Sequence, residues 1–216
     1  MKLLDLYKQF GIIGICKRGI NHLIKPFFKL TEIIVVAIPN HKKNDTFTNN
    51  SVKLMTKKRV AEWHRNNYIN DSEAKKFNNF LDSFCTGYYV EIKNELAAWG
   101  FVQNKGKYQY GEYIYDIPNK VYILKNLFVK SKFRSKSLGK LINEARIMGV
   151  PNNCIPCGFV LPDNHYAMRN LKLYGFQEYF KVSHSICFNI NMKIRFQIIK
   201  DNKLNKHIIK GFKKLY

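Results

Sequence analysis

The stretch "LFVKSKFRSKSLGKL", residues 127–141, decides the fold, because an apolar run gives way here to basic residues, serines and a glycine before apolar residues return. Residues 120–129 form the most apolar strand of the chain, and residues 137–149 have the spacing of a helix. A helix that begins just after a strand presents free backbone N–H groups and the positive end of its dipole to an anion. The stretch therefore predicts an anion-binding loop between a strand and a helix.

The residues of this loop fit a pyrophosphate. Gly139 stands in the first turn of the expected helix, where a missing side chain lets a phosphate approach. Arg134 and Lys136 add positive charge. The lysine and hydroxyl that close a Walker loop are absent, so the pattern is not that of a P-loop nucleotide-binding protein. We predict that residues 134–140 hold a pyrophosphate.

The same loop resembles that of the GNAT family, the acyl-CoA-dependent N-acyltransferases, in which [QR]-x-x-G-x-[GA] follows an L-x-V strand end. Leu127 and Val129 match the strand end. Arg134 matches the first position of the loop and Gly139 the last. Ser137 stands where the family usually has its middle glycine.

A second stretch, "LPDNHYAMRNLKLYGF" at residues 161–176, resembles the family pattern N-x-x-A-x-x-x-Y-x-x-x-G-F. The matching residues are Asn164, Ala167, Gly175 and Phe176. The tyrosine position of the family holds Leu171. The resemblance covers about residues 51–190 and implies an α/β fold with a mixed, mostly antiparallel central sheet flanked by helices.

The resemblance implies an enzyme that moves an acyl group, most simply acetyl, from acyl-CoA to a primary amine. It assigns stabilisation of the oxyanion to backbone N–H groups at the splayed end of the strand 127–129. Asn164 is either a helix N-cap, a polar contact to the coenzyme arm, or both. The expected coenzyme-binding residues are Leu127, Phe128, Val129, Arg134, Ser135, Lys136, Ser137, Leu138, Gly139, Lys140 and Asn164.

A general base must take the proton of the ammonium group, because such an amine is almost fully charged at neutral pH. Residues 108–117 are expected to form one strand, on which Glu112 and Asp116 would point to the same face of the sheet. Glu112 is therefore our candidate base, and a solvated strand face is the alternative.

The acid that protonates the leaving thiolate is usually the tyrosine that Leu171 replaces here. Tyr166, Asn170 and Tyr174 are spaced along one helical face, so a tyrosine could arrive from a neighbouring turn. Tyr174 is our candidate acid, with packing as the alternative.

Helices and strands alternate along the rest of the chain, as in a mixed α/β protein. We expect an N-terminal extension of helix and strand over 1–45, an acyltransferase domain over 46–191 and a basic strand or tail over 192–216. Thr56 and Asp71 are the expected N-caps of two helices.

The composition indicates which partners and which cellular compartment to expect. The chain of 216 residues carries a formal net charge of +22, which favours anionic partners. Five scattered cysteines are not a secreted disulfide framework. Cys154 and Cys157 form a C-x-x-C without further ligands for zinc, so no metal is expected. The longest uncharged run of the N-terminal thirty residues, from residue 9 to 16, is too short to span a membrane, and we expect a cytoplasmic protein.

Residues 3–30 have the pattern of a basic amphipathic helix, and residues 200–216 are also basic and partly apolar. Peripheral contact with the inner face of a membrane is one interpretation, and packing on the protein's own sheet is the other. The charge suggests an anionic acceptor such as an amino sugar. The alternative to an enzyme is a degenerate domain that binds an anionic membrane surface or nucleic acid, although nucleic acid is not the partner we expect of the enzyme.

Overall fold

The computed structural model describes residues 28–39, 41–42, 51–111, 113–187, 190–191, 194–200 and 203–214. The chain forms two compact units, which we call the loop unit and the hairpin unit. The loop unit comprises residues 40–107 and 117–157, and the hairpin unit comprises residues 1–39, 108–116 and 158–216. Most of the amphipathic helix predicted for residues 3–30 lies outside the described residues.

The loop unit contains a mixed sheet with the strand order β8-β7-β4-β3-β2. Its strands are β2 (Val52–Leu54), β3 (Cys85–Ile92), β4 (Glu95–Gln103), β7 (Val121–Val129) and the first part of β8 (Ile155–Val160). Neighbouring strands are antiparallel except β7 and β8, which are parallel. The predicted mixed, mostly antiparallel sheet flanked by helices is confirmed.

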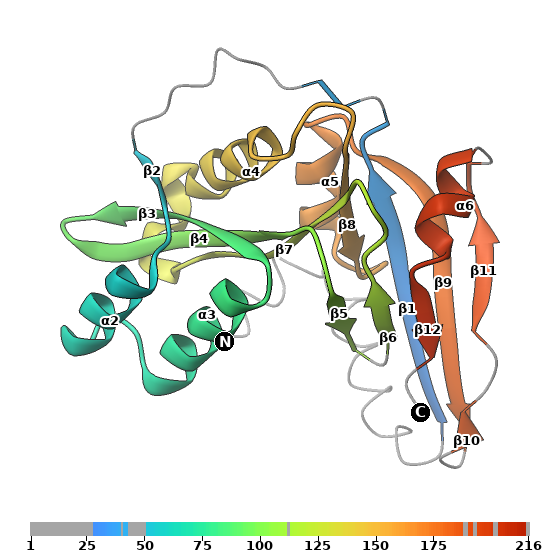
Figure 1. Cartoon of the computed structure of the whole chain (residues 1–216), viewed down its shortest axis with the longest axis horizontal. Coiled ribbons are helices and arrows are strands. Elements are labelled where there is room, and N and C mark those ends of the chain that lie inside the picture. The colour runs from blue at the N-terminus through green and yellow to red at the C-terminus, as the bar shows by residue number, and fades with distance from the viewer. Residues whose placement is uncertain are drawn as a thin grey trace. The chain divides into compact units, whose positions relative to one another are not determined.

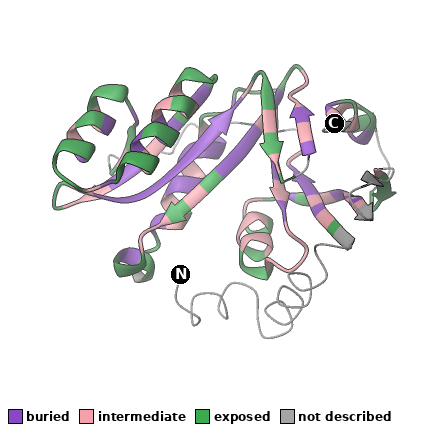
Figure 2. Ribbon diagram, turned by 90° about the horizontal axis from the view of Figure 1, so that it is seen from below, coloured by how far each residue is buried: buried purple, intermediate pink, exposed green. Residues whose placement is uncertain are grey.

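Helices cover both faces of this sheet (Figure 1), with α2 (Lys57–Arg65) and α3 (Asp71–Asp82) on one face and α4 (Leu138–Met148) on the other. β4 is the central strand and is buried along almost its whole length, and in Figure 2 the helices expose their outer sides. Trp63, Phe77 and Phe101 belong to the core under α2 and α3, and Leu138 and Ile142 belong to the core under α4.

Of the two N-caps predicted from the sequence, Thr56 is confirmed and Asp71 is wrong. Thr56 caps α2 by accepting a hydrogen bond from the backbone N–H of Arg59 at 3.2 Å. The N-cap of α3 is Asn70 rather than Asp71, because Asn70 and Glu73 bind each other's backbone N–H in a capping box. Asp71 instead occupies the first turn, where its charge favours the helix dipole.

The hairpin unit is built around β1 (Phe28–Ala37) and β9 (Gln177–Cys187), which pair antiparallel. The strand expected after the N-terminal helix is thus present, and it begins at residue 28, inside the range 3–30 of the amphipathic pattern. β10 (Ile190–Asn191) and β11 (Arg195–Ile198) also pair with β9, and α5 (His165–Lys172) precedes it.

The single strand predicted for residues 108–117 is wrong. The segment forms two strands, β5 (Lys107–Tyr110) and β6 (Tyr113–Asp116), in one small sheet with β12 (Phe212–Lys214). Gly111 turns the chain between them at a φ of 58°, a conformation that glycine adopts without strain. The helix α6 (Lys203–Ile209) lies within the segment 192–216 that was predicted as strand or tail.

No helix among the described residues is long and apolar enough to cross a membrane. Cys154 is half-buried just before β8, and Cys157 is fully buried within that strand. In the part of the chain that the structure describes, no group of three His, Cys, Asp or Glu side chains is placed to hold a metal ion.

Candidate functional site: a bulged strand and a helix N-terminus

The strand β7 carries an irregularity just before its last residues. Trp99 on β4 pairs with Phe128, whereas Phe101 pairs with Lys125, so two residues of β7 lie opposite Gly100 alone. This is a β-bulge. Asn126, one of the two, has a φ of 52°, a left-handed conformation that asparagine tolerates better than most residues.

Beyond the bulge, one edge of β7 presents backbone groups that pair with no strand among the described residues. Pairing with β8 extends from Val121 to Ile123, and β7 continues to Val129. The N–H of Lys130 donates to Ala97 of β4 at 2.9 Å. Because successive residues of a strand point their N–H groups to opposite edges, the N–H groups of Leu127 and Val129 point away from β4. At the strand end that was predicted to bind the oxyanion, the N–H groups of Leu127 and Val129 thus lie on the edge away from β4, whereas that of Phe128 faces β4.

A short 3-10 helix, Ser131–Lys136, connects β7 to α4. Phe133 anchors it in the core together with Leu138 and Ile142. Ser137, the N-cap of α4, is left-handed at φ 53° and its side chain makes no capping hydrogen bond. The N–H groups of Lys140 and Leu141 donate to the carbonyl oxygen of Ser137. Those of Leu138 and Gly139 precede them in the helix and have no intrahelical partner, so they can serve an anion.

Gly139 has an open side towards the end of β7. A Cβ atom built on it would meet Val129 Cγ2 at 3.6 Å, an ordinary van der Waals distance. The protein itself therefore does not require a glycine at this position. In the part of the chain that the structure describes, Val129 is the one residue beyond the start of α4 that lies within 4 Å of such a Cβ.

The lysines and the arginine of the segment fall into two groups. Lys130 and Lys132 both contact Glu95, and the hydrogen bond from Lys132 holds the pKa of this carboxyl below its ordinary value. Arg134 and Lys136 are exposed near the start of α4. The guanidinium of Arg134 reaches back to the carbonyl oxygen of Val129, with an Nε–O distance of 3.4 Å. The positive charge beside the helix N-terminus thus comes from Arg134 and Lys136, together with Lys140 in the first turn of α4.

Ser135 lies within the 3-10 helix, and Lys140 is exposed in the first turn of α4, with its Nζ 4.0 Å from Oε1 of Glu144. The three other predicted site residues, Asn164, Tyr174 and Glu112, do not belong to the loop unit. Asn164 caps α5 by accepting from the N–H of Ala167 at 3.1 Å, which confirms its structural interpretation. Tyr174 follows the end of α5 in a turn and is half-buried, so it does not extend a helical face with Tyr166. Glu112 lies outside the described residues.

The shared face proposed for Glu112 and Asp116 depended on one continuous strand, which the β5–β6 turn at Gly111 replaces. Asp116 ends β6, and its backbone N–H donates to Gly211 at 2.7 Å. The candidate base therefore loses the strand argument that supported it.

The sequence prediction missed the bulge and the buried polar groups around it. Lys125, the residue before the bulge, is buried, and its ammonium donates to Gln103 at 2.7 Å. On the other face of the sheet, Arg146 and Asn143 of α4 are buried beside the same strand. A polar Lys125–Asn126 pair inside the most apolar strand is a signal in the sequence that could have indicated the bulge.

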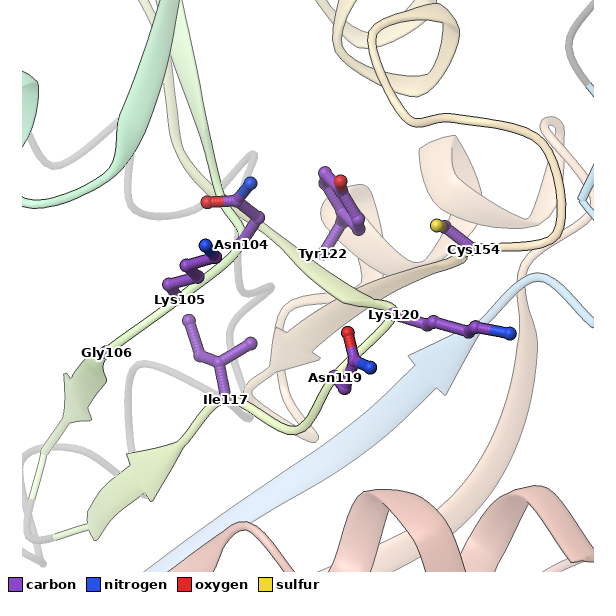
Figure 3. Close-up of a pocket in the computed structure, with 8 residues that line it drawn as sticks. All are labelled: Asn104, Lys105, Gly106, Ile117, Asn119, Lys120, Tyr122 and Cys154. Atoms are coloured by element: carbon purple, nitrogen blue, oxygen red, sulfur yellow. The ribbon is translucent and has the colours of Figure 1, made fainter.

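A separate hollow of about 330 Å³ lies at the start of β7, far along the strand from the loop (Figure 3). The lining residues are Asn104, Lys105, Gly106, Ile117, Asn119, Lys120, Tyr122 and Cys154. None of them is a predicted site residue. The hollow and the predicted pyrophosphate loop are therefore different features of the loop unit.

No protein-family model matches the sequence, and no curated protein matches it. Solved structures similar to this one include an acetyltransferase assigned to the GNAT family from Novosphingobium aromaticivorans, with 11% identity over 73% of this chain and 63% of that chain, and a TM-score of 0.46. A Drosophila protein has 14% identity over 82% of this chain and 59% of that one, with a TM-score of 0.49.

An aminoglycoside 6'-N-acetyltransferase from Acinetobacter haemolyticus has 13% identity over 72% of this chain and 100% of that one, with a TM-score of 0.42. The chain spans about 60% of the length of the first two structures. The case for a function therefore depends on the residues of this chain.

Proposed function

We propose that this protein is an acyl-CoA-dependent N-acyltransferase, which transfers an acyl group from acyl-CoA to a primary amine. One observation carries the proposal. A single continuous segment, residues 127–139, offers two sets of backbone N–H donors, at the unpaired edge of β7 and at the start of α4. The first set suits a carbonyl oxygen that becomes an oxyanion, and the second suits a diphosphate.

The diphosphate of the coenzyme would lie at the N-terminus of α4. The N–H groups of Leu138 and Gly139 would donate to its oxygens, and Arg134 and Lys136 would balance its charge. Gly139 leaves the approach open. The coenzyme arm would then run along the end of β7, so that the thioester carbonyl reaches the N–H of Leu127 or Val129.

The reaction needs three events at this strand end. A neutral amine attacks the thioester carbon and forms the C–N bond, the carbonyl oxygen takes up negative charge, and the C–S bond then breaks to release the thiolate. The backbone donors of Leu127 and Val129 would stabilise the oxyanion. The departing thiol has a pKa of about 8.5 and leaves tolerably well without an acid, so Leu171 in the usual tyrosine position is compatible with turnover. The amine loses its proton to a base. Glu112 was the candidate from the sequence, and the strand argument for it no longer holds.

The acceptor is proposed to be a small or glycan-type primary amine, and the acyl group to be acetyl. The formal charge of +22 supports an acceptor that carries negative charge, such as an amino sugar on a phosphorylated carrier. We also propose that the protein acts in the cytoplasm, where acyl-CoA would be its co-substrate.

The test is a calorimetric titration of the full chain with acetyl-CoA. We expect saturable binding by the wild type and much weaker binding by Gly139→Asp, because the added carboxylate lies beside the diphosphate site. Asn79→Asp is the matched control, since it adds the same charge on the exposed side of α3 and should bind like the wild type. If the wild type shows no saturable binding, the acyltransferase proposal fails and a binding protein without catalysis becomes the better explanation.

A further inference from the structure

Arg146 of α4 is buried against the sheet with 3% of its surface exposed. Its Nη1 donates to the backbone oxygen of Lys125 at 3.1 Å, and its Nη2 donates to the side-chain oxygen of Asn143, which is 1% exposed. Burying a charged group costs several kcal/mol unless it is well hydrogen-bonded, and an apolar side chain of similar volume often packs as well. Packing of the core alone therefore does not explain an arginine at this position.

The opposing strand is shaped to admit this side chain. A Cβ atom on Gly100 would lie 2.8 Å from Cδ of Arg146 and 2.8 Å from Cγ2 of Ile142. Gly100 is also the residue that faces the two bulged residues of β7. Because Gly100 has no side chain, the aliphatic part of Arg146 can cross β4 and reach β7 at its bulge.

Lys125, the residue just before the bulge, is held from both faces of the sheet. On the α4 face its carbonyl oxygen accepts from Arg146. On the α3 face its ammonium donates to Gln103 and lies 4.1 Å from the centre of the Phe80 ring. The plane of a trans peptide group is rigid, so the bond from Arg146 fixes the peptide that leads into Asn126.

We propose that Arg146 is a positioning residue that locks the bulge in place, and thereby directs the N–H groups of Leu127 and Val129 to the unpaired edge of β7. This role rests on the proposed acyl transfer, in which those groups bind the thioester carbonyl. The reason is geometric, because a shift of one residue along a strand exchanges the two edges to which its N–H groups point. If the bulge moved by one residue towards Val129, the N–H of Leu127 would turn towards β4.

The test uses acetyl-CoA labelled with 13C at the thioester carbonyl and the full-length protein. Binding to the wild type should move the carbonyl resonance downfield, because N–H donors polarise the carbonyl. Arg146→Lys keeps the charge and most of the buried stem, but one ammonium cannot bridge the oxygens of Lys125 and Asn143 as the guanidinium does. We expect this variant to bind acetyl-CoA with little loss of affinity, since the loop at α4 is untouched, and to lose most of the downfield shift.

Chemical rescue separates positioning from general stability. Guanidinium added to Arg146→Ala should restore the carbonyl shift, whereas Arg65→Ala, at an exposed position on α2, should shift normally with or without it. If Arg146→Ala does not fold, the lysine variant decides the question. Its backbone amide resonances at 125–129 should then move while those at 134–140 stay unchanged.

The outcomes separate the two proposals. A wild type that does not bind acetyl-CoA overturns the acyltransferase proposal and the positioning role with it. Suppose that Arg146→Lys binds acetyl-CoA normally, produces the same downfield carbonyl shift as the wild type and has the same amide resonances at 125–129. Only the role of Arg146 is then overturned. A lost carbonyl shift at nearly normal affinity supports both.

Discussion

Replacing Gly139 by alanine should stabilise the protein and weaken its binding of acetyl-CoA. The new Cβ would lie 3.6 Å from Val129 Cγ2, so no part of the protein has to move. Alanine is favoured over glycine within a helix by up to about 1 kcal/mol, and we expect about 0.5–1 kcal/mol at the second residue of α4. For a chain of this size, that gain corresponds to a rise in Tm of about 1–4 °C.

The loss of binding has a different cause. The same methyl group would enter the space between the start of α4 and the end of β7, along which the coenzyme is proposed to run. A loss of about 1.4 kcal/mol or more, which is tenfold in affinity, is the expected scale for an obstructed phosphate contact. Denaturant unfolding measures the first effect, and calorimetric titration with acetyl-CoA measures the second.

Gly175→Ala is the matched control for the stability of the glycine variants. Nothing lies within 4 Å of a Cβ at this position, but the backbone has a φ of 82°, so alanine should destabilise the protein by about 1 kcal/mol. If Gly139→Ala binds acetyl-CoA as tightly as the wild type, the glycine does not serve the coenzyme and the loop assignment is refuted. A destabilised Gly139→Ala would refute the packing argument instead.

Two further predictions concern helix capping and the buried lysine. Asn70→Ala should lower the free energy of unfolding by about 1 kcal/mol, whereas Asp71→Asn should change it by a few tenths; equal losses in denaturant unfolding would contradict the assignment of Asn70 as the cap. Burial lowers the pKa of the Lys125 ammonium, so the unfolded chain binds this proton more tightly than the folded protein does. The unfolding free energy should therefore rise with pH between the lowered pKa and about 10.4, and this rise should be absent in Lys125→Met when unfolding is measured across that range.

The sequence predicts most strands and helices of the loop unit because burial leaves a clear pattern of apolar residues in each of them. β4 and β7 are rich in apolar residues, and α2 and α3 carry buried residues on one side only. The error at residues 108–117 arises where this signal is ambiguous. Tyrosines alternate at 108 and 110 and again at 113 and 115, and the turn at Gly111 shifts this alternation by only one residue.

The strand, short loop and helix start of the proposed anion loop could be predicted because they are local in the sequence. A strand, basic residues and a glycine at the start of a helix are adjacent in the chain, and a helix N-terminus binds anions by its backbone alone. The bulge could not be predicted in the same way. It depends on Gly100, Asn126 and Arg146, which are far apart in the sequence and meet only after α4 has packed on β4.

Ser137 shows how the same backbone can accept a residue that departs from the family pattern. Its φ of 53° is a conformation in which a glycine costs nothing and a serine costs about 1–2 kcal/mol. Phe133 and Leu138, buried on either side of it, fix the chain before and after this residue, so the turn is imposed by packing rather than by the residue at its centre. The backbone path needed to open α4 towards an anion is therefore kept although the glycine is not. The side chain that Ser137 adds occupies space outside the loop, where a ligand would bind.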